Sequence, residues 1–416
     1  MAALSAGALA LASLGGCAQD DGRVKLDFFQ FKGEANEHFR TLVERFEAAN
    51  PDVDVVINET PDADTAIRTL LVKGRTPDVM TLNGSGKFGE LAKAGVFHDF
   101  TGDPLLDELN PAAVQIMQDL GTYRGEEVNS LPYWLNADGI IYNRDIFAEH
   151  QLDPPTTWDE LIEVCDTLQA NGVQPFFGTL ADAWTALPSL NGLGAYPAAE
   201  GFFEAADQAE GALGTSGAPS FARDWRETFE RQSQLFAYAG AQASANSYDD
   251  GNAAFANGGS AMLMQGVWAL PMVRQLNPDI DAGVFPYPTD AAKDRLLVSG
   301  VDVTIAIGRD TPRLEAAKRF VDFLFQAEQL EWIAAQQNMF SARADSPGSG
   351  DPALVELQPL FDAGQVAGFP DHQFSASVPL QQIDQQFLMD GDLDGALATL
   401  DDEWSKVAAR DTRKGI

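Results

Sequence analysis

Basic residues are scarce in this chain of 416 residues. Lys and Arg together number 27 against 62 Asp and Glu, which gives a formal net charge of −35. A nucleic-acid partner or an anionic lipid surface needs clustered Lys and Arg opposite its phosphates. The charge balance therefore argues against both kinds of partner. The acidic residues are spread along the chain, which indicates a solvated surface rather than an acidic tail.

Cysteine and histidine are also rare, with two and four residues. Because Cys17 and Cys165 are the only cysteines, a disulfide framework, a zinc ribbon and a Cys-x-x-Cys redox pair are excluded. Cys165 recurs with Leu161 and Leu168 at helical spacing, which predicts a buried structural thiol. The histidines never stand at metal-ligand spacing, so we expect no metal and no cofactor; they are His38, His98, His150 and His372.

Beyond the N-terminus no apolar run approaches the roughly 18 residues of a transmembrane helix. Residues 3–16, "ALSAGALALASLGG", have the length of a signal peptide and lead into "LGGC", which resembles the lipobox of bacterial lipoproteins. The resemblance implies that Cys17 is lipidated and becomes the new N-terminus. No Lys or Arg precedes the run, as a secretory signal normally requires, and a start codon assigned too late would explain this. We expect a signal peptide over residues 1–17 and a polar tether over 18–24.

Strand and helix patterns alternate along the chain, which predicts an α/β fold with a parallel-rich sheet. Residues 181–270 are expected to be mostly helical, residues 313–337 form one long helical stretch, and a terminal helix covers 392–410. Thr157 and Glu160 stand in capping-box register before a further helix. The segments that read as strands are "VKLDFFQF", "VDVVIN", "DVMTL", "ADGIIYN", "AGVFPYP" and "VSGVDVTIAIG".

Two motifs have a possible chemistry and a simpler interpretation. "GSGKFG" at 84–89 is a formal G-x-G-x-x-G, but it follows the third strand, where any α/β protein can bind a ligand. Dinucleotide binding is therefore disfavoured. "DGDLDGALATLD" at 390–401 nearly matches a calcium loop, with Asp401 where a bidentate Glu is needed. The alternative is a turn followed by a helix with an acidic first turn, so calcium stays an open question here.

Several aromatic residues lie in or beside Gly-, Pro- and Asn-rich connections rather than at core helical spacing. Aromatic faces beside amide and carboxylate groups suit sugars, which have apolar C–H faces and hydroxyl edges. For any one of these residues core packing is the competing interpretation. The residues are Trp134, Trp184, Tyr248, Trp268, Tyr287, Phe369 and Phe374.

Five segments, taken in their order along the chain, resemble the extracellular solute-binding proteins of ABC sugar importers, the family that includes maltose-binding protein. The resemblance runs from about residue 25 to the C-terminus. The resemblance implies a two-lobed periplasmic-binding-protein-like fold, each lobe an α/β sheet flanked by helices, joined by hinge crossings. It implies one lobe from 25–135 plus 289–325 and a second from 136–288 plus 326–416. The segments are "TPDVMTLNGSGKFGELAKAGVFHDF", "LPYWLNADGIIYNRDIF", "PTTWDEL", "FANGGSAMLMQGVWAL" and "RFVDFLFQAEQLEWIAAQQNMFSA".

The same resemblance implies a set of ligand-binding residues in the cleft. Trp184 and Trp268 match stacking aromatics, and the loop "NGSG" differs from the charged and aromatic residues of maltose-type proteins. Asp302 with the Asp371–His372 pair is similar to contacts in raffinose- and α-glucoside-binding members. The full implied set is Lys32, Glu34, Asn83, Ser85, Asn136, Trp184, Trp268, Asp302, Asp371 and His372.

The expected function is that of a monomeric, lipid-anchored substrate-binding subunit without catalytic activity. It would hold an oligosaccharide, of the α-glucoside or raffinose type, outside the cytoplasmic membrane and present it to the transmembrane subunits of an ABC permease. One alternative is a secreted glycoside hydrolase, which would need two carboxylates about 5 to 10 Å apart. Another is a surface adhesion or scaffold protein.

Overall fold

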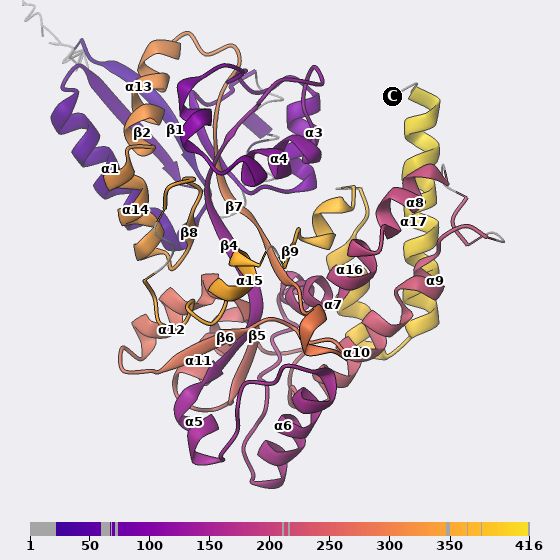
Figure 1. Ribbon diagram of the computed structural model, residues 1–416. Coiled ribbons are helices and arrows are strands. Elements are labelled where there is room, and N and C mark those ends of the chain that lie inside the picture. The colour runs from indigo at the N-terminus through magenta and orange to yellow at the C-terminus, as the bar shows by residue number, and fades with distance from the viewer. Residues whose placement is uncertain are drawn as a thin grey trace, which may run out of the picture.

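The computed structural model describes residues 22–59, 67, 69–70, 74–209, 212–214, 217–346, 350–363, 365–375 and 377–414. The expected signal peptide, Cys17 and most of the expected tether lie outside these residues. The chain forms an upper and a lower body, joined by strands that pass between them (Figure 1). No helix of the described part is long and apolar enough to cross a membrane.

The upper body is built on three parallel strands with helices against the sheet. β1 lies between β2 and β3 and pairs in parallel with both. Phe39, Leu42, Val43 and Phe46 of the first helix are buried, as their spacing predicts, and Phe28 of β1 packs edge-on against Phe39. The elements are β1 (Val24–Gln30), α1 (Asn36–Ala49), β2 (Val53–Glu59), β3 (Val79–Leu82), α3 (Gly86–Lys93), α4 (Pro111–Leu120), α13 (Leu314–Leu324) and α14 (Ala327–Gln336).

Two long strands, β4 (Leu131–Asn143) and β7 (Leu297–Ile307), run from the upper body into the lower one (Figure 1). The first half of β4 pairs antiparallel with β7, and its second half pairs with β5 (Met262–Gly266) and β6 (Ala282–Phe285). The sheet order β2-β1-β3-β7-β4-β5 is therefore continuous through both bodies. Both strands are buried along almost their whole length, which explains their apolar sequence.

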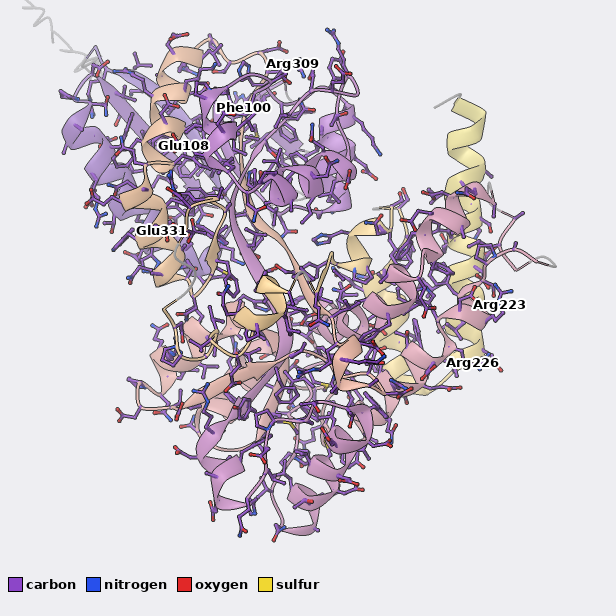
Figure 2. All side chains as sticks on the ribbon, in the orientation of Figure 1. Phe100, Glu108, Arg223, Arg226, Arg309 and Glu331 are labelled. Atoms are coloured by element: carbon purple, nitrogen blue, oxygen red, sulfur yellow. The ribbon has the colours of Figure 1, made fainter. Side chains whose placement is uncertain are left out.

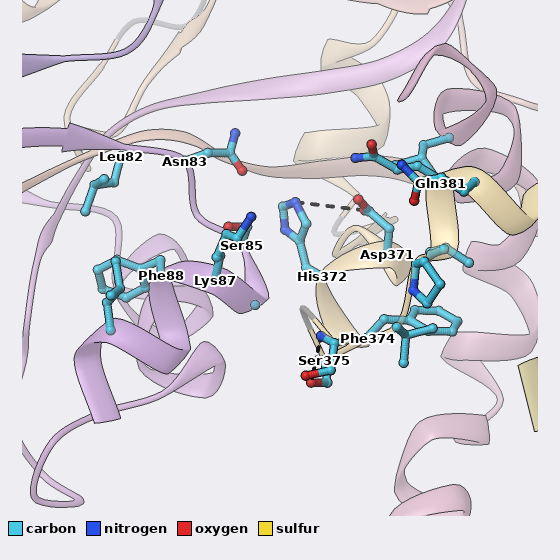
Figure 3. Close-up of a pocket in the computed structure, with 18 of the residues that line it drawn as sticks. Leu82, Asn83, Ser85, Lys87, Phe88, Asp371, His372, Phe374, Ser375 and Gln381 are labelled. Carbon is cyan, nitrogen blue, oxygen red and sulfur yellow. Dashed lines mark hydrogen bonds and ion pairs between the residues drawn. The ribbon is translucent and has the colours of Figure 1, made fainter. Parts of the chain in front are cut away.

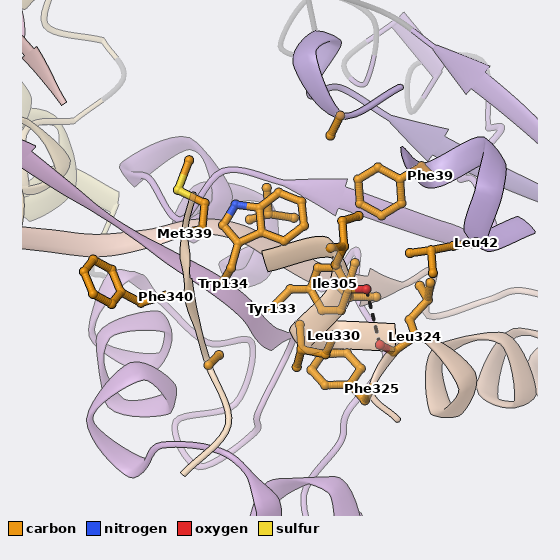
Figure 4. Close-up of a cluster of buried hydrophobic side chains, with 14 of the residues drawn as sticks. Phe39, Leu42, Tyr133, Trp134, Ile305, Leu324, Phe325, Leu330, Met339 and Phe340 are labelled. Atoms are coloured by element: carbon orange, nitrogen blue, oxygen red, sulfur yellow. Dashed lines mark hydrogen bonds between the residues drawn. The ribbon is translucent and has the colours of Figure 1, made fainter. Parts of the chain in front are cut away.

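The crossing is held in the upper body by an aromatic core (Figure 4). Trp134 of β4 stacks on Phe39 with ring centroids 5.9 Å apart, and Tyr133 donates a hydrogen bond of 3.2 Å from its hydroxyl to the Leu324 carbonyl. All three rings are buried. This packing fixes the start of β4, and with it the side chains that β4 carries toward the lower body.

The lower body surrounds the second half of β4 with helices. α7 crosses the sheet face, while α17 runs along the outer side of the body (Figure 1). The capping box of Thr157 and Glu160 is present at the start of α6, as predicted. The main helices are α5 (Arg144–Glu149), α6 (Trp158–Ala170), α7 (Leu187–Ala199), α8 (Phe202–Gln208), α9 (Phe221–Asp224), α10 (Arg226–Ala237), α11 (Tyr248–Ala256), α12 (Leu270–Leu276), α15 (Gln358–Asp362), α16 (Leu380–Asp390) and α17 (Leu393–Lys414).

Short elements complete the fold. They are the strands β8 (Phe340–Ser341) and β9 (Val366–Ala367) and the 3₁₀ helices η1 (Gly33–Ala35), η2 (Pro104–Glu108), η3 (Ala183–Ala186), η4 (Val267–Ala269), η5 (Ala292–Asp294) and η6 (Pro370–Gln373).

Four expectations need correction. The sheet is mixed rather than parallel-rich, because the crossing strands β4 and β7 pair antiparallel with each other and with β3, β5 and β6. β5 is a strand inside the region expected to be mostly helical. The sequence did not indicate it, because its five residues are all buried and show no alternation of buried and exposed positions. The single stretch at 313–337 is two helices, since Gln326 has an extended ψ of 133° between α13 and α14. α14 packs on α1 and α13, and β8 pairs with β4 in the upper body, so residues 327–341 do not lie in the second lobe as the boundary at 326 implied. The remaining lobe boundaries stay predictions.

Candidate ligand-binding cleft

A cavity of about 640 Å³ lies where the upper and lower bodies face each other (Figure 3). The upper body contributes the loop after β3 and the start of α3, and the lower body contributes η6 and the start of α16. This volume is in the range of small-molecule sites. Its polar lining residues include Asn83, Ser85, Lys87, Asp371, His372, Ser375 and Gln381.

The carboxylate of Asp302, on β7, is the centre of a buried hydrogen-bond network. Lys32 Nζ lies 3.0 and 2.8 Å from its two oxygens, Trp134 Nε1 donates over 2.8 Å, and Asn136 Nδ2 donates over 3.2 Å. Asn83 Nδ2 donates to the Asp302 backbone carbonyl over 3.1 Å. Side chains from four separate strands or strand ends are therefore held in one arrangement, and Asp302 is only 4% exposed.

The charges of this network reinforce each other. Lys32 Nζ also contacts Glu34 Oε1 at 3.2 Å. Burial acts to lower the pKa of Lys32, but the charges of Asp302 and Glu34 outweigh it and raise that pKa above its usual value. Burial acts to raise the pKa of Glu34, and the charge of Lys32 holds it below its usual value instead. Lys32 and Glu34 are thus both ionised at neutral pH. The Glu34 side chain keeps 36% of its exposure and can meet a ligand.

An aromatic pair of the lower body approaches this charged group through Tyr248. The rings of Trp184, in η3, and Tyr248, at the start of α11, lie with centroids 4.9 Å apart and tilted by 58°. Burial raises the pKa of Tyr248 to about 12, and the charges of Glu34 and Lys32 also act on its hydroxyl. An aromatic pair from one body therefore lies opposite ionised groups from the other.

The Asp371–His372 pair forms part of the opposite wall, in η6. His372 Nε2 lies 3.9 Å from Asp371 Oδ1 (Figure 3), and the His372 ring stacks on Phe369 with centroids 5.1 Å apart. The backbone N–H of Asp371 donates to Asn191 Oδ1 on α7 over 2.9 Å. These contacts orient the imidazole and the carboxyl side by side at the cavity.

The start of α3 touches the η6 segment directly. A Cβ atom added to Gly86 would lie 2.8 Å from the Phe374 carbonyl oxygen and 3.3 Å from that of His372. Gly86 is therefore required for the close approach of the two backbones. Since Phe374 belongs to the core of the lower body, this contact closes the cleft on one side.

Four of the ten predicted ligand-binding residues line the cavity, and the Asp302 network adjoins it through Asn83. Lys32, Glu34, Asn83, Asn136 and Asp302 form one network; Ser85, Asp371 and His372 line the cavity; Trp184 pairs with Tyr248. Trp268 is half-buried and packs against the small cluster of Ala195, Val298 and Phe369. Whether each contacts a ligand stays a prediction. Among the other aromatic candidates, Trp134, Tyr287 and Phe374 belong to buried core clusters, and Trp134 also holds Asp302.

The acidic motif at 390–401 has partners within the fold. α17 begins at Leu393, so a calcium loop is not formed there. Asp394 forms an ion pair of 2.6 Å with Arg226. Arg226 is labelled in Figure 2. Asp401 accepts a hydrogen bond of 2.7 Å from the Phe221 backbone N–H. Within the described residues, no group of three or more His, Cys, Asp or Glu side chains is arranged to hold a metal ion.

Cys165 is buried as predicted, and burial raises its thiol pKa to about 12. A thiol in this state is unreactive near neutral pH, because the thiolate is the nucleophilic form. Its role is therefore packing in the core of the lower body.

Comparison with known proteins agrees with this architecture. The family model described as "Bacterial extracellular solute-binding protein" matches residues 32–331, well over half of the chain. The chain belongs to this family. The family assignment and the two-lobed fold expected from the sequence are thus confirmed, and the protein is a substrate-binding protein of the ABC-importer type.

This solute-binding protein has relatives of known name and structure. It is 28% identical over 315 residues to the multiple sugar-binding protein of Streptococcus mutans, covering 74% of this chain and 73% of the relative. The structure of RafE in complex with raffinose matches with a TM-score of 0.81 and 23% identity, covering 92% of this chain and all of RafE. A Bacillus licheniformis sugar transporter protein in complex with stachyose matches with a TM-score of 0.73 and 19% identity, covering 92% of this chain and all of the transporter protein. The relatives are substrate-binding proteins, and the glycoside hydrolase alternative finds no support among them.

Proposed function

We propose that this solute-binding protein captures an oligosaccharide, of the raffinose or α-glucoside type, between its two bodies and delivers it to an ABC permease without changing it. The observation that carries the proposal is the Asp302 network at the cleft. It presents a fixed set of amide, ammonium and carboxylate groups next to aromatic rings. The names of three of the similar proteins, which concern multiple sugars, raffinose and stachyose, support the same ligand class.

The arrangement suits sugars for a chemical reason. Sugar hydroxyls both donate and accept hydrogen bonds, so they pair well with Glu34, Asp371 and the amide groups of the cleft. The apolar C–H face of a pyranose packs on an aromatic plane such as Trp268. Because the network is already held by contacts within the protein, few side chains have to be ordered when the ligand binds.

The proposal includes the cellular setting implied by "LGGC". A lipidated Cys17 would tether a monomer to the outer face of the cytoplasmic membrane, with the permease subunits as its protein partners. Expression of wild type and Cys17→Ser in a bacterial host, followed by membrane fractionation, tests the anchor. Wild type should be recovered with membranes and the variant in the soluble fraction; equal distribution of the two would contradict the anchor.

Thermal denaturation with a panel of mono- and oligosaccharides tests the ligand class. A ligand that binds only the folded state at a hundredfold excess over its Kd stabilises by about 2.7 kcal/mol and raises the melting temperature. We expect a shift with raffinose-type or α-glucoside sugars, and unchanged sugar on chromatography afterwards. Cleaved sugar would mean an enzyme, and no shift with any member of the panel would contradict a sugar ligand.

A further inference from the structure

Asn136 and Asp138 lie two residues apart on β4 and therefore point to the same face of the sheet. In the antiparallel register Asn136 lies opposite Gly300 of β7, and Asp138 lies opposite Gly266 of β5. Directly opposed residues place their side chains on the same face. Each polar side chain of this β4 face is thus next to a position that has no side chain.

The space left by both glycines is filled by aromatic rings. A Cβ on Gly300 would lie 2.7 Å from the Phe369 ring, and a Cβ on Gly266 would lie 2.0 Å from the Trp268 ring. Phe369 and Trp268 therefore pack against the sheet on the two sides of β4, at Gly300 and at Gly266. They flank the polar groups of Asn136 and Asp138, which is the arrangement expected around a sugar ring.

The polar groups of this face lack partners. Among the described residues neither carboxylate oxygen of Asp138 has a hydrogen-bond partner beyond the backbone N–H of the adjacent Gly139, although the side chain is only 1% exposed. The Tyr287 hydroxyl, Asn136 Oδ1 and Asp371 Oδ1 also have no hydrogen bond among the described residues, and Asp371 Oδ1 meets only His372 Nε2 at 3.9 Å. Buried polar atoms are nearly always paired, and an unpaired one is destabilising. A group of them on one face therefore points to a ligand that supplies the missing bonds.

The protonation of Asp138 and Tyr287 also suits a ligand that presents hydroxyl groups. Burial raises the pKa of Asp138 well above its usual value and the nearby Asp371 charge adds to this, while the Gly139 backbone N–H acts in the other direction. Burial also raises the pKa of Tyr287. A protonated carboxyl donates one hydrogen bond and accepts another, as an amide does. A phosphate or carboxylate ligand would instead be repelled by the negative charge of Asp371.

We propose that Asp138 is a specificity-determining residue of this protein: with Asp371 and Tyr287 it binds the hydroxyls of the sugar ring that lies between Trp268 and Phe369, and it selects uncharged sugars over acidic ones. This inference rests on the proposed function. It assigns a residue that determines ligand specificity to β4, a strand whose sequence is largely apolar.

The test uses the full protein with raffinose as probe, or whichever neutral oligosaccharide gives wild type its largest thermal shift. Asp138→Leu removes both polar atoms, Asp138→Asn keeps one donor and one acceptor, and Tyr287→Phe removes only the unpaired hydroxyl. Asp384→Asn is the matched control, because Asp384 is equally buried with one unpaired oxygen but lies between α10 and α16 against Gln232. Affinity is measured by calorimetry, and the melting temperature without sugar is measured in parallel.

We expect Asp138→Leu to weaken raffinose binding at least tenfold while raising the melting temperature of the sugar-free protein. Asp138→Asn should stay within about threefold of wild type, Tyr287→Phe should weaken binding severalfold, and Asp384→Asn should bind as wild type. Unchanged affinity in Asp138→Leu and Tyr287→Phe, with wild type binding normally, would overturn this inference and leave the proposed function intact. Binding of a uronic-acid disaccharide by wild type as tightly as its neutral counterpart would also overturn it. Failure of wild type to bind any sugar would overturn both.

Discussion

The contact between Gly86 and the η6 segment allows a direct test of cleft closure. In Gly86→Ala the new Cβ would lie 2.8 Å from the Phe374 carbonyl oxygen, and ordinary contact begins at 3.4 Å, so the two backbones would have to separate by about 0.6 Å. Neither carbonyl is the end of a flexible side chain, so the separation must involve the two bodies. Gly86 has no positive φ, and alanine is accepted at the first turn of α3 without local strain.

The expected result is weaker binding by a protein that is at least as stable. Overpacking of this kind costs about 1 to 3 kcal/mol, which corresponds to a five- to 150-fold loss in raffinose affinity. The loss applies only to the closed form. In the open form alanine should stabilise the protein by up to about 1 kcal/mol through helix propensity and reduced freedom of the unfolded chain.

Calorimetric titration and thermal denaturation of the sugar-free protein provide the assay. Gly33→Ala is the control, because Gly33 is also the first residue of a short helix in the upper body and its Cβ would meet nothing within 4 Å. The control should bind as wild type does. If Gly86→Ala binds sugar with wild-type affinity, the reasoning that the α3–η6 contact belongs to the liganded form is refuted.

Three further predictions concern charge, stacking and pH. Lys32→Met removes one partner of a buried ion pair and should lower the free energy of unfolding by about 3 to 5 kcal/mol in urea titrations; a loss below 1 kcal/mol would show that Asp302 does not need Lys32. Trp268→Ala should weaken sugar binding by roughly tenfold or more with little change in melting temperature, since the ring is half-buried; equal affinity would remove Trp268 from the site. Burial raises the pKa of Asp384 from 3.8 to about 7, so the folded state keeps a proton that the unfolded chain loses, and stability should fall as pH rises from about 4 to 7. Asp384→Asn should flatten this decline, and its melting temperature relative to wild type should be higher at pH 8 than at pH 5; an identical pH dependence in both proteins would contradict the assignment.

Local structure was predictable wherever one physical signal dominated. The buried face of α1 follows from the spacing of Phe39, Leu42 and Phe46, and the α6 capping box follows from Thr157 and Glu160. β5 was not predictable, because a run of five buried residues reads equally as strand or helix. The break between α13 and α14 was missed for a related reason, since no Gly or Pro marks it.

The site depended on information that local patterns do not contain. Lys32 and Asp302 are 270 residues apart in the chain, and only the family resemblance placed both in the cleft. Asp138 was not singled out, because in "ADGIIYN" it reads as an ordinary polar residue of a strand. Its meaning comes from the register that puts it opposite Gly266, and register is set by the packing of the whole sheet.

Isothermal titration of the full protein with melibiose, raffinose and stachyose, followed by chromatography of the recovered sugar, tests the central claim most directly. The account predicts saturable binding of at least one of these sugars at one molecule per protein, with the sugar recovered unchanged. Absence of heat and of any thermal shift with all three and with α-glucosides, or recovery of cleaved sugar, would contradict it.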